Sequence, residues 1–282
     1  MNNSASLKNI PDDLSLSEVK SLFESAGIPD AAYDAEMIFQ EIGGISRIDI
    51  KLSNPKTSDA AVIAAVKRRL CREPLQYIIG KAYFFRECYT VNESCLIPRQ
   101  DTEILVEYAA SHIPGGARFL DLCSGSGCVG ISTLKNTKNT TAILADISSD
   151  ALELAKKNAK DNGVFERAEF LNADVLSVPI ADECFAVLSN PPYVLESEYT
   201  VLEPEIGFEP KIAFLGGEDG LDFYRTLVPM YKSRISEDGF IAFEIGASQA
   251  SALSEIAEEN AMSIEVIKDL SGNDRVCVLR RR

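Results

Sequence analysis

The chain is short of histidine, of basic residues and of long apolar runs, and each shortage excludes a class of protein. Its one histidine, His112, would have to serve any Ser-His-Asp triad, and no HExxH segment is present for a zinc protease. His112 follows an apolar stretch and precedes Pro114, so we expect a solvated residue at a helix end. Hydrolytic chemistry based on histidine therefore has no support.

Apolar runs long enough to cross a membrane are also missing. No stretch approaches the roughly 18 uninterrupted apolar residues of a transmembrane helix. Residues 1–15 carry no apolar segment of the kind found in secretory signals. The seven cysteines are odd in number and form no CxxC pair, so we expect free thiols in a reducing compartment. The expectation is a cytoplasmic protein that binds neither membranes nor metals.

Negative charge dominates the ionisable residues. Asp and Glu number 43 against 28 Lys and Arg, which gives a net charge of −15. Such a chain repels phosphate backbones at long range, so we expect no stable binding of nucleic acid, although the net charge does not exclude a local basic groove. These numbers do not fix the oligomeric state, for which a monomer is the expectation.

The hydrophobic pattern divides the chain, whose 282 residues suggest about two domains. Residues 1–80 form the predicted N-terminal helical domain. Apolar residues recur there with the helical period at 16–26, 30–42 and 58–72, and glycines end the first two runs. This part carries no catalytic constellation, so its role is either packing or the binding of a macromolecular partner.

The next segment, residues 81–98, is aromatic and β-branched. It predicts a β-hairpin or an extended connector, with residues 92–94 as a possible turn. Pro98 ends the segment. Asp101-Thr102 is then expected to cap a helix that continues to about Ser111.

Residues 99–282 form the predicted catalytic domain, in which strand and helix patterns alternate from residue 118 onward. This alternation predicts an α/β fold with a mainly parallel sheet. The expected strands are 118–123, 141–146, 168–174, 185–190, 240–245 and 275–280. Ligands of such sheets bind beyond the carboxyl ends of the strands, so candidate functional residues are sought there.

A glycine-rich turn follows the first of these strands. Gly125, Gly127 and Gly130 satisfy the GxGxxG pattern, which lets the backbone approach a ligand closely. Asp146 ends the next strand, where its carboxylate can accept both hydroxyls of a ribose. The arrangement fits a dinucleotide or another adenosine cofactor. Asp121 distinguishes a dinucleotide from another adenosine cofactor, because a carboxylate repels a pyrophosphate and tolerates an ammonium or a sulfonium.

The tetrapeptide Asn190-Pro191-Pro192-Tyr193 ends the fourth strand. Because proline cannot continue a central ladder, simple strand termination is the alternative to a functional role. The residues suit methylation of an amide or aromatic amino nitrogen, whose delocalised lone pair is a poor nucleophile. The Asn190 side chain and the Pro191 carbonyl can accept its two N–H groups, and the prolines pre-organise both acceptors. Tyr193 can lie against the flat substrate group, and catalysis is then mostly positioning.

These motifs resemble those of known methyltransferases. The glycine turn with Asp121 resembles the first motif of class I S-adenosylmethionine-dependent methyltransferases, and NPPY occurs in enzymes for adenine N6 and for glutamine N5. Four more segments together resemble the HemK/PrmC family, protein-(glutamine-N5) methyltransferases that act on peptide-chain release factors. They are LIPRQDTE at 96–103, FEP at 208–210, GGEDGL at 216–221 and GNDRV at 272–276. The resemblance is strong over residues 72–282 and weak before them.

The resemblance implies a Rossmann-like, seven-stranded sheet with an antiparallel final strand, and an N-terminal helical bundle that helps to dock the release factor. It implies methyl transfer from S-adenosyl-L-methionine, which becomes S-adenosyl-L-homocysteine, to the glutamine of a Gly-Gly-Gln motif. Asp146 would hold the ribose and Asp174 the adenine amino group, although Asp174 could instead cap a turn. The implied cofactor contacts are Asp121, Cys123, Ser124, Gly125, Ser126, Gly127, Asp146, Asp174, Val175 and Asn190, and the implied catalytic residues are Asn190, Pro191, Pro192 and Tyr193.

Two residues depart from the family pattern. Gln100 stands where the family usually has proline, and Cys123 where it usually has glycine. The second departure has a cost only if the position needs a positive φ. Two roles stay open: Arg99 is either a helix-entry residue or a cofactor contact, and residues 208–210 are either a loop near the acceptor or a turn.

Three other functions are compatible with part of the sequence. An adenine-N6 methyltransferase of DNA or RNA shares the tetrapeptide, but a basic target-recognition domain is not evident and the net charge opposes it. A nicotinamide-dependent dehydrogenase would use the glycine pattern and leave Asp121 and the tetrapeptide unexplained. A cofactor-binding scaffold without catalysis conflicts with the intact tetrapeptide.

Overall fold

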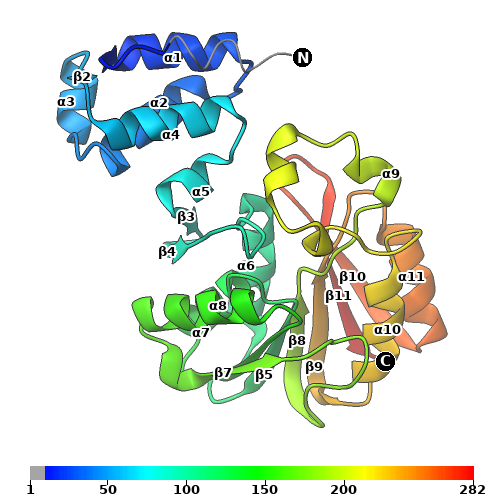
Figure 1. The fold of residues 1–282 in the computed structure, drawn as a ribbon. Coiled ribbons are helices and arrows are strands. Elements are labelled where there is room, and N and C mark those ends of the chain that lie inside the picture. The colour runs from blue at the N-terminus through cyan, green and yellow to red at the C-terminus, as the bar shows by residue number, and fades with distance from the viewer. Residues whose placement is uncertain (1–9) are drawn as a thin grey trace. The chain divides into compact units, whose positions relative to one another are not determined.

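The computed structural model describes residues 10–282, which form two compact units (Figure 1). The first extends to Lys81 and includes Glu203–Phe208 from much later in the sequence. The second comprises Ala82–Leu202 and Glu209–Arg282 and contains the main sheet. Within residues 10–282, no helix is both long and apolar enough to cross a membrane.

The first unit is helical, as the sequence predicts. The three expected helices are confirmed as α1 (Leu16–Ser25), α2 (Ala31–Glu41) and α4 (Ala60–Leu70). Two short helices, α3 (Arg47–Leu52) and α5 (Leu75–Ile79), and the antiparallel strands β1 (Leu14–Ser15) and β2 (Lys56–Thr57) accompany them. Ser15 and Glu18 form a capping box that begins α1. The apolar faces of these helices meet in one buried cluster that includes Phe23, Ile38, Phe39, Val62 and Val66.

A cluster of ion pairs in this unit is centred on the buried residues Asp34 and Arg69 and extends to the half-buried residues Arg72 and Glu205. Arg69 of α4 lies 2.7 Å from Asp34 of α2 and 2.9 Å from Glu205, and Arg72 lies 2.7 Å from Glu205. Glu205 belongs to the 3₁₀ helix η4 (Pro204–Phe208). The side chains of Arg69 and Asp34 are only 6% and 8% exposed. Because buried charges need partners, the two arginines hold the late segment 203–208 in the helical unit.

The second unit is built on a seven-stranded sheet with the strand order β10-β11-β9-β8-β5-β6-β7. The strands are β5 (Arg118–Leu122), β6 (Thr141–Asp146), β7 (Ala168–Asn172), β8 (Cys184–Ser189), β9 (Ile235–Glu244), β10 (Met262–Lys268) and β11 (Asp274–Arg281). Strands β5 to β9 pair in parallel, whereas β11 is antiparallel to both β9 and β10. The predicted α/β fold and antiparallel final strand are confirmed. The edge strand β10 is one that the strand prediction missed.

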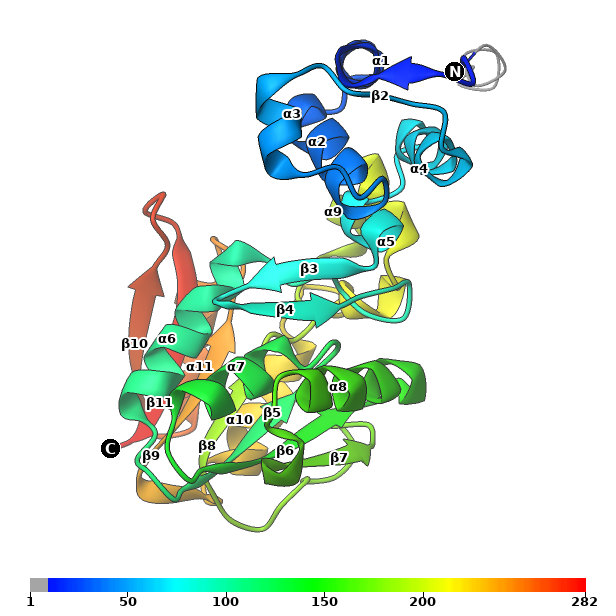
Figure 2. The same cartoon turned by 90° about the vertical axis from the view of Figure 1, so that its left-hand side faces the viewer.

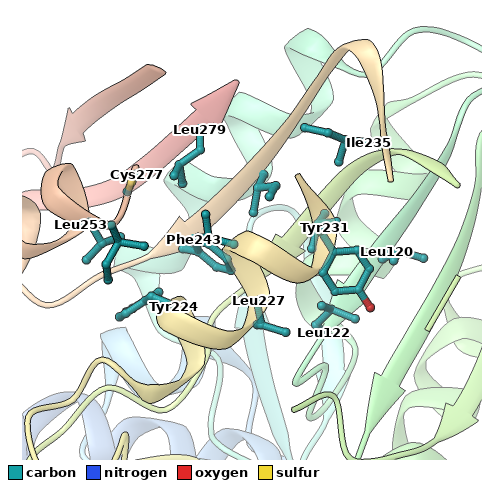
Figure 3. Close-up of a cluster of buried hydrophobic side chains, with 14 of the residues drawn as sticks. Leu120, Leu122, Tyr224, Leu227, Tyr231, Ile235, Phe243, Leu253, Cys277 and Leu279 are labelled. Atoms are coloured by element: carbon teal, nitrogen blue, oxygen red, sulfur yellow. The ribbon is translucent and has the colours of Figure 1, made fainter. Parts of the chain in front are cut away.

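Helices cover both faces of this sheet (Figures 1 and 2). The elements α6 (Glu103–His112), α7 (Cys128–Asn136) and α8 (Ser149–Asp161) lie on one face, and α10 (Asp222–Tyr231) and α11 (Ala250–Glu259) lie on the other. Tyr224 and Leu227 of α10 are buried against the sheet residues Leu122 and Phe243 (Figure 3). Strand alternation then directs Asp121 to the opposite face, toward α7.

The predicted hairpin and the predicted turn at residues 92–94 are both confirmed, but this turn does not connect the two strands of the hairpin. β3 (Lys81–Phe84) pairs with β4 (Glu87–Thr90), and the chain reverses between them at Phe85-Arg86 rather than at residues 92–94. Phe85 has a φ of +59°, which is rare for an aromatic residue, and its N–H donates to the Glu103 carboxylate at 2.7 Å. Residues 92–94 form a separate turn in which Asn92 accepts from the Ser94 N–H.

Two expectations about individual side chains are confirmed. His112 is the last residue of α6, is exposed, and stacks on Tyr108 with a ring separation of 3.9 Å. All the cysteines are free thiols, and those buried in the structure are Cys95, Cys128, Cys184 and Cys277.

The buried ion pairs of the helical unit lead to a stability prediction. Asp34→Ala should lower the free energy of unfolding by about 3 kcal/mol, because it leaves the buried Arg69 with less compensation. Lys51→Ala, which breaks the exposed pair with Glu36, is the matched control and should cost less than about 1 kcal/mol. Urea denaturation followed by circular dichroism measures both. Equal losses in the two variants would contradict a structural role for the buried cluster.

Candidate functional site

A cavity of about 390 Å³ lies in the second unit, at the carboxyl ends of β5, β6 and β8. Its volume suits a small organic ligand. The predicted site residues that line it are Asp121, Cys123, Ser124, Gly125, Ser126, Asp146, Asp174, Val175, Asn190 and Pro192. Gly127, Pro191 and Tyr193 are outside the lining. The fold thus brings together two motifs that lie about 60 residues apart, because parallel strands end at the same edge of the sheet.

The glycine turn connects β5 to α7 in a tight left-handed path. Cys123, Gly125 and Gly127 have φ values of +60°, +51° and +79°. Gly130, inside α7, lies so close to β5 that a Cβ atom would be 2.8 Å from Asp121 Oδ2. The conformation at Cys123 is one that glycine adopts without strain, so the family departure at this position costs about 1 kcal/mol.

Two carboxylates fix the turn, that of the buried Asp121 and that of the half-buried Asp146. Asp121 Oδ2 accepts the Gly130 N–H at 2.8 Å, and the carboxylate of Asp146 accepts the N–H groups of Gly125 at 2.8 Å and Ser148 at 2.9 Å. Burial raises the pKa of Asp121 to about 7 and also raises the pKa of Asp146, while the backbone donors oppose both shifts. The turn therefore presents carboxylate oxygens to the cavity in a water-poor setting.

Asp174 lies after β7, and the turn cap that was the alternative to an adenine contact is confirmed. It lines the cavity, and it also caps a turn by accepting from the Leu176 N–H at 3.0 Å and the Ser177 hydroxyl at 2.6 Å. The Ser177 hydrogen bond lowers the pKa of this exposed carboxyl. Its neighbour Val175 is buried and adds apolar surface to the cavity.

The tetrapeptide follows β8, and hydrogen bonds hold two of its side chains. Asn190 Nδ2 donates to Thr102 Oγ1 at 3.2 Å, and the Tyr193 hydroxyl donates to Glu244 Oε1 at 3.1 Å. Thr102 in turn donates to Glu244 Oε2. The Tyr193 hydroxyl is thus engaged with β9, and Asn190 contributes the amide that lines the cavity.

The expected capping role of Asp101-Thr102 is wrong. The 3₁₀ helix η2 (Gln100–Thr102) leads into α6, and the Thr102 side chain makes no cap hydrogen bond. Its hydroxyl is committed to Glu244 instead, and the Asp101 carboxylate lies 3.2 Å from Arg275. Glu244 itself was missed by the sequence analysis, although a carboxylate at the end of an apolar strand in a parallel sheet was a signal for it.

The sequence left open the roles of Arg99 and of residues 208–210, and the structure connects the two. Arg99 lines the cavity and donates to Glu209, whose other carboxylate oxygen accepts the Ile97 N–H at 2.8 Å. Glu209 is buried, which raises its pKa, and the Arg99 charge opposes that shift. Pro210 follows it in the cavity lining. Arg99 is therefore a rim residue of the cavity, and the 208–210 segment continues into its wall.

Comparisons with known proteins find matches for the N-terminal helical part of the chain and for the part that follows it. Residues 15–80 match the family model described as the PrmC N-terminal domain, and residues 100–204 match the methyltransferase small domain. The release factor glutamine methyltransferase of Thermodesulfovibrio yellowstonii is 38% identical over 258 residues, covering 88% of this chain and 92% of the relative. The enzyme of that name from Clostridium acetobutylicum is 39% identical over 222 residues, covering 77% and 78%.

The fold is also that of solved methyltransferases. A methyltransferase from Pyrococcus furiosus, 15% identical, superimposes with a TM-score of 0.52 over 69% of this chain and 89% of its own. This likeness concerns the fold alone, whereas the sequence relatives extend over most of the chain at 30% identity or more. The chain belongs to the release factor glutamine methyltransferase family.

Proposed function

We propose that this protein transfers the methyl group of S-adenosyl-L-methionine to the N5 amide nitrogen of the glutamine in the Gly-Gly-Gln motif of peptide-chain release factors. Membership of the family supports the enzyme class, the cofactor and the release factor as substrate. The observation that carries the assignment to this site is the meeting of Asn190 with the glycine turn in one cavity. The family relationship favours glutamine over adenine N6 as the acceptor.

The polar groups that line the cavity match the polar groups of the cofactor. Ser124 Oγ is buried and has no hydrogen-bond partner among the described residues, although it lines the cavity, so a polar ligand would satisfy it. Asp146 keeps free lone pairs for ribose hydroxyls, Asp174 stands on the wall for an adenine amino group, and Asp121 suits the ammonium end. When bound, the cofactor supplies a methyl carbon made electrophilic by the neighbouring sulfonium.

The chain's own contribution to catalysis is to orient the acceptor amide. The lone pair of an amide nitrogen is delocalised into the carbonyl group, which makes the nitrogen a poor nucleophile. Both N–H groups must therefore be held by hydrogen bonds, so that the lone-pair lobe of the nitrogen points at the methyl carbon. We assign one N–H to Asn190 Oδ1 and the other to the Pro191 carbonyl. Pro192 restricts the backbone conformation where the chain passes from the sheet to the cavity. Tyr193 would lie beside the substrate group. The proton leaves after transfer, so these residues act by positioning and electrostatics.

The cellular setting follows from the substrate. Release factors act in translation, and the free thiols suit a reducing compartment, so we place the enzyme in the cytoplasm. We assign docking of the release factor to the helical unit. A monomer without stable nucleic-acid binding is consistent with the net charge of −15.

Gly127 provides a test of the cofactor site. Gly127→Ala combines a φ of +79° with a Cβ atom 2.8 Å from Ile131 Cδ1 and 3.1 Å from Ala155 Cβ, so the turn or the side chains packed against it must shift, and cofactor affinity should fall at least about tenfold. Gly116→Ala is the matched control, because its φ of +84° brings the same backbone strain with nothing within 4 Å. Calorimetric titration with S-adenosyl-L-methionine measures both. Equal affinities in the two variants would rule out the turn as the cofactor cradle.

Asn190 provides a test of the acceptor site. Asn190→Ala should lower kcat about 100-fold or more, because it removes an acceptor that holds the reacting amide, and should leave cofactor affinity nearly unchanged. Asn260→Ala, which removes a hydrogen bond at the end of α11, is the control and should retain activity. Methyl transfer to a purified release factor, followed by mass spectrometry, gives kcat. Full activity of Asn190→Ala would remove Asn190 from the mechanism.

The substrate assignment has its own experiment. The protein is mixed with S-adenosyl-L-methionine and a release factor, with duplex DNA as a parallel substrate, and the products are analysed by intact mass and peptide mapping. One added methyl on the Gly-Gly-Gln glutamine is the expected result. Methylated adenine would refute the acceptor assignment and leave the cofactor assignment intact.

A further inference from the structure

Glu244 is a buried carboxylate that the proposed reaction does not use. It is the last residue of β9 and is only 2% exposed. Within residues 10–282 it has no ion pair, since the nearby Arg275 is bound to Asp101 at 3.2 Å and Asp269 at 3.1 Å. Burial of an ionised carboxylate costs several kcal/mol unless hydrogen bonds offset it. At Glu244, two hydroxyl groups are the hydrogen-bond donors that offset this cost of burial.

Both donors connect Glu244 to the tetrapeptide. The Tyr193 hydroxyl donates to Oε1 at 3.1 Å and the Thr102 hydroxyl donates to Oε2. Thr102 Oγ1 also accepts from Asn190 Nδ2 at 3.2 Å. The carboxylate therefore reaches one tetrapeptide side chain directly and another through a single hydroxyl.

A hydroxyl relay of this kind selects one orientation of the asparagine amide. Thr102 has one proton, and because Glu244 takes it, only lone pairs of Thr102 face Asn190. Asn190 must then turn its NH₂ group toward Thr102, which directs Oδ1 away from it. Asn190 lines the cavity, so this orientation makes Oδ1 available to an incoming N–H.

We propose that Glu244 is a positioning residue for methyl transfer, which orients Asn190 through the Thr102 hydroxyl so that Asn190 Oδ1 accepts an N–H of the substrate amide. The proposal rests on the proposed function. In the reversed orientation, the Asn190 NH₂ group would face the N–H groups of the substrate and repel them. The tetrapeptide backbone does not choose between the two orientations, because the two ends of an amide have nearly the same shape.

The relay depends on the charge of Glu244. Burial raises the pKa of Glu244, the Thr102 and Tyr193 hydroxyls and the Arg275 guanidinium oppose that shift, and the Asp101 carboxylate adds to it. The Tyr224 hydroxyl is a further polar neighbour, and it donates to the backbone carbonyl of Glu244 and not to its carboxylate. A protonated Glu244 could donate to Thr102, which would free the Thr102 proton for Asn190 Oδ1. Activity should therefore fall on the acid side, above the pH at which an exposed glutamate titrates.

The test compares isosteric variants in the full chain. Thr102→Val keeps the shape and removes the hydroxyl, so kcat should fall about 10- to 100-fold with little change in cofactor affinity or in KM for the release factor. Thr102→Ser restores the hydroxyl and most of the activity. Glu244→Gln should lose the acid limb of the pH profile, and the double variant Thr102→Val/Glu244→Gln should be no slower than Thr102→Val alone. Tyr224→Phe, which removes a buried hydroxyl beside Glu244, should lower Tm and leave kcat unchanged.

The outcomes separate the relay from the function on which it rests. A wild-type protein that fails to methylate the release factor contradicts the proposed function. An active wild type with an equally active Thr102→Val, or with multiplicative losses in the double variant, contradicts the relay. The side-chain NH₂ resonances of Asn190 in ¹⁵N-labelled protein test the relay without substrate. They should shift in Thr102→Val and stay in place in Tyr224→Phe, and unchanged resonances in both would overturn the proposal.

Discussion

The site depends on one constraint, which is that neighbouring parallel strands end at the same edge of the sheet. β5, β6 and β8 pair in register, so the turns that follow Leu122, Asp146 and Ser189 lie side by side. The polar groups of those turns cannot point into the sheet, which is packed on both faces by apolar residues. They surround the cavity instead, and residues from distant parts of the sequence become one site.

Carboxylates that are buried (Asp121, Glu244) or half-buried (Asp146) hold this arrangement in place. Asp121 accepts the N–H of Gly130 in α7, Asp146 accepts the N–H of Gly125 in the glycine turn, and Glu244 accepts from the hydroxyls of Thr102 and Tyr193. Each carboxylate loses hydration when it is buried, and the fixed donors offset that cost only in one geometry. The same physical device therefore holds the proposed cofactor cradle at β5 and β6 and the tetrapeptide at β8.

Sequence reasoning found what is contiguous and missed what depends on tertiary contacts. The glycine turn and the tetrapeptide were predicted because each chemical group has its neighbours within a few residues. Glu205 and Glu244 were missed because their partners are distant in the sequence: Arg69 is 136 residues from Glu205, and Thr102 and Tyr193 are 142 and 51 residues from Glu244. β10 was missed although Met262, Ile264 and Val266 alternate with polar residues, since the edge strand is only half-buried and its pattern is weak. The hairpin turn at Phe85 was missed because a positive φ at an aromatic residue is set by tertiary contacts and not by turn chemistry.

The proposed relay from Glu244 shows how the tetrapeptide can depend on residues outside it. Proline residues restrict the backbone of the tetrapeptide, but they leave the Asn190 amide free to rotate about its last torsion. A hydroxyl at residue 102 and a carboxylate at residue 244, on a helix entry and a neighbouring strand, remove that freedom. The direction of a single proton then decides whether the cavity presents an acceptor or a donor. The information for this choice is spread over three segments, and only the folded sheet brings those segments together.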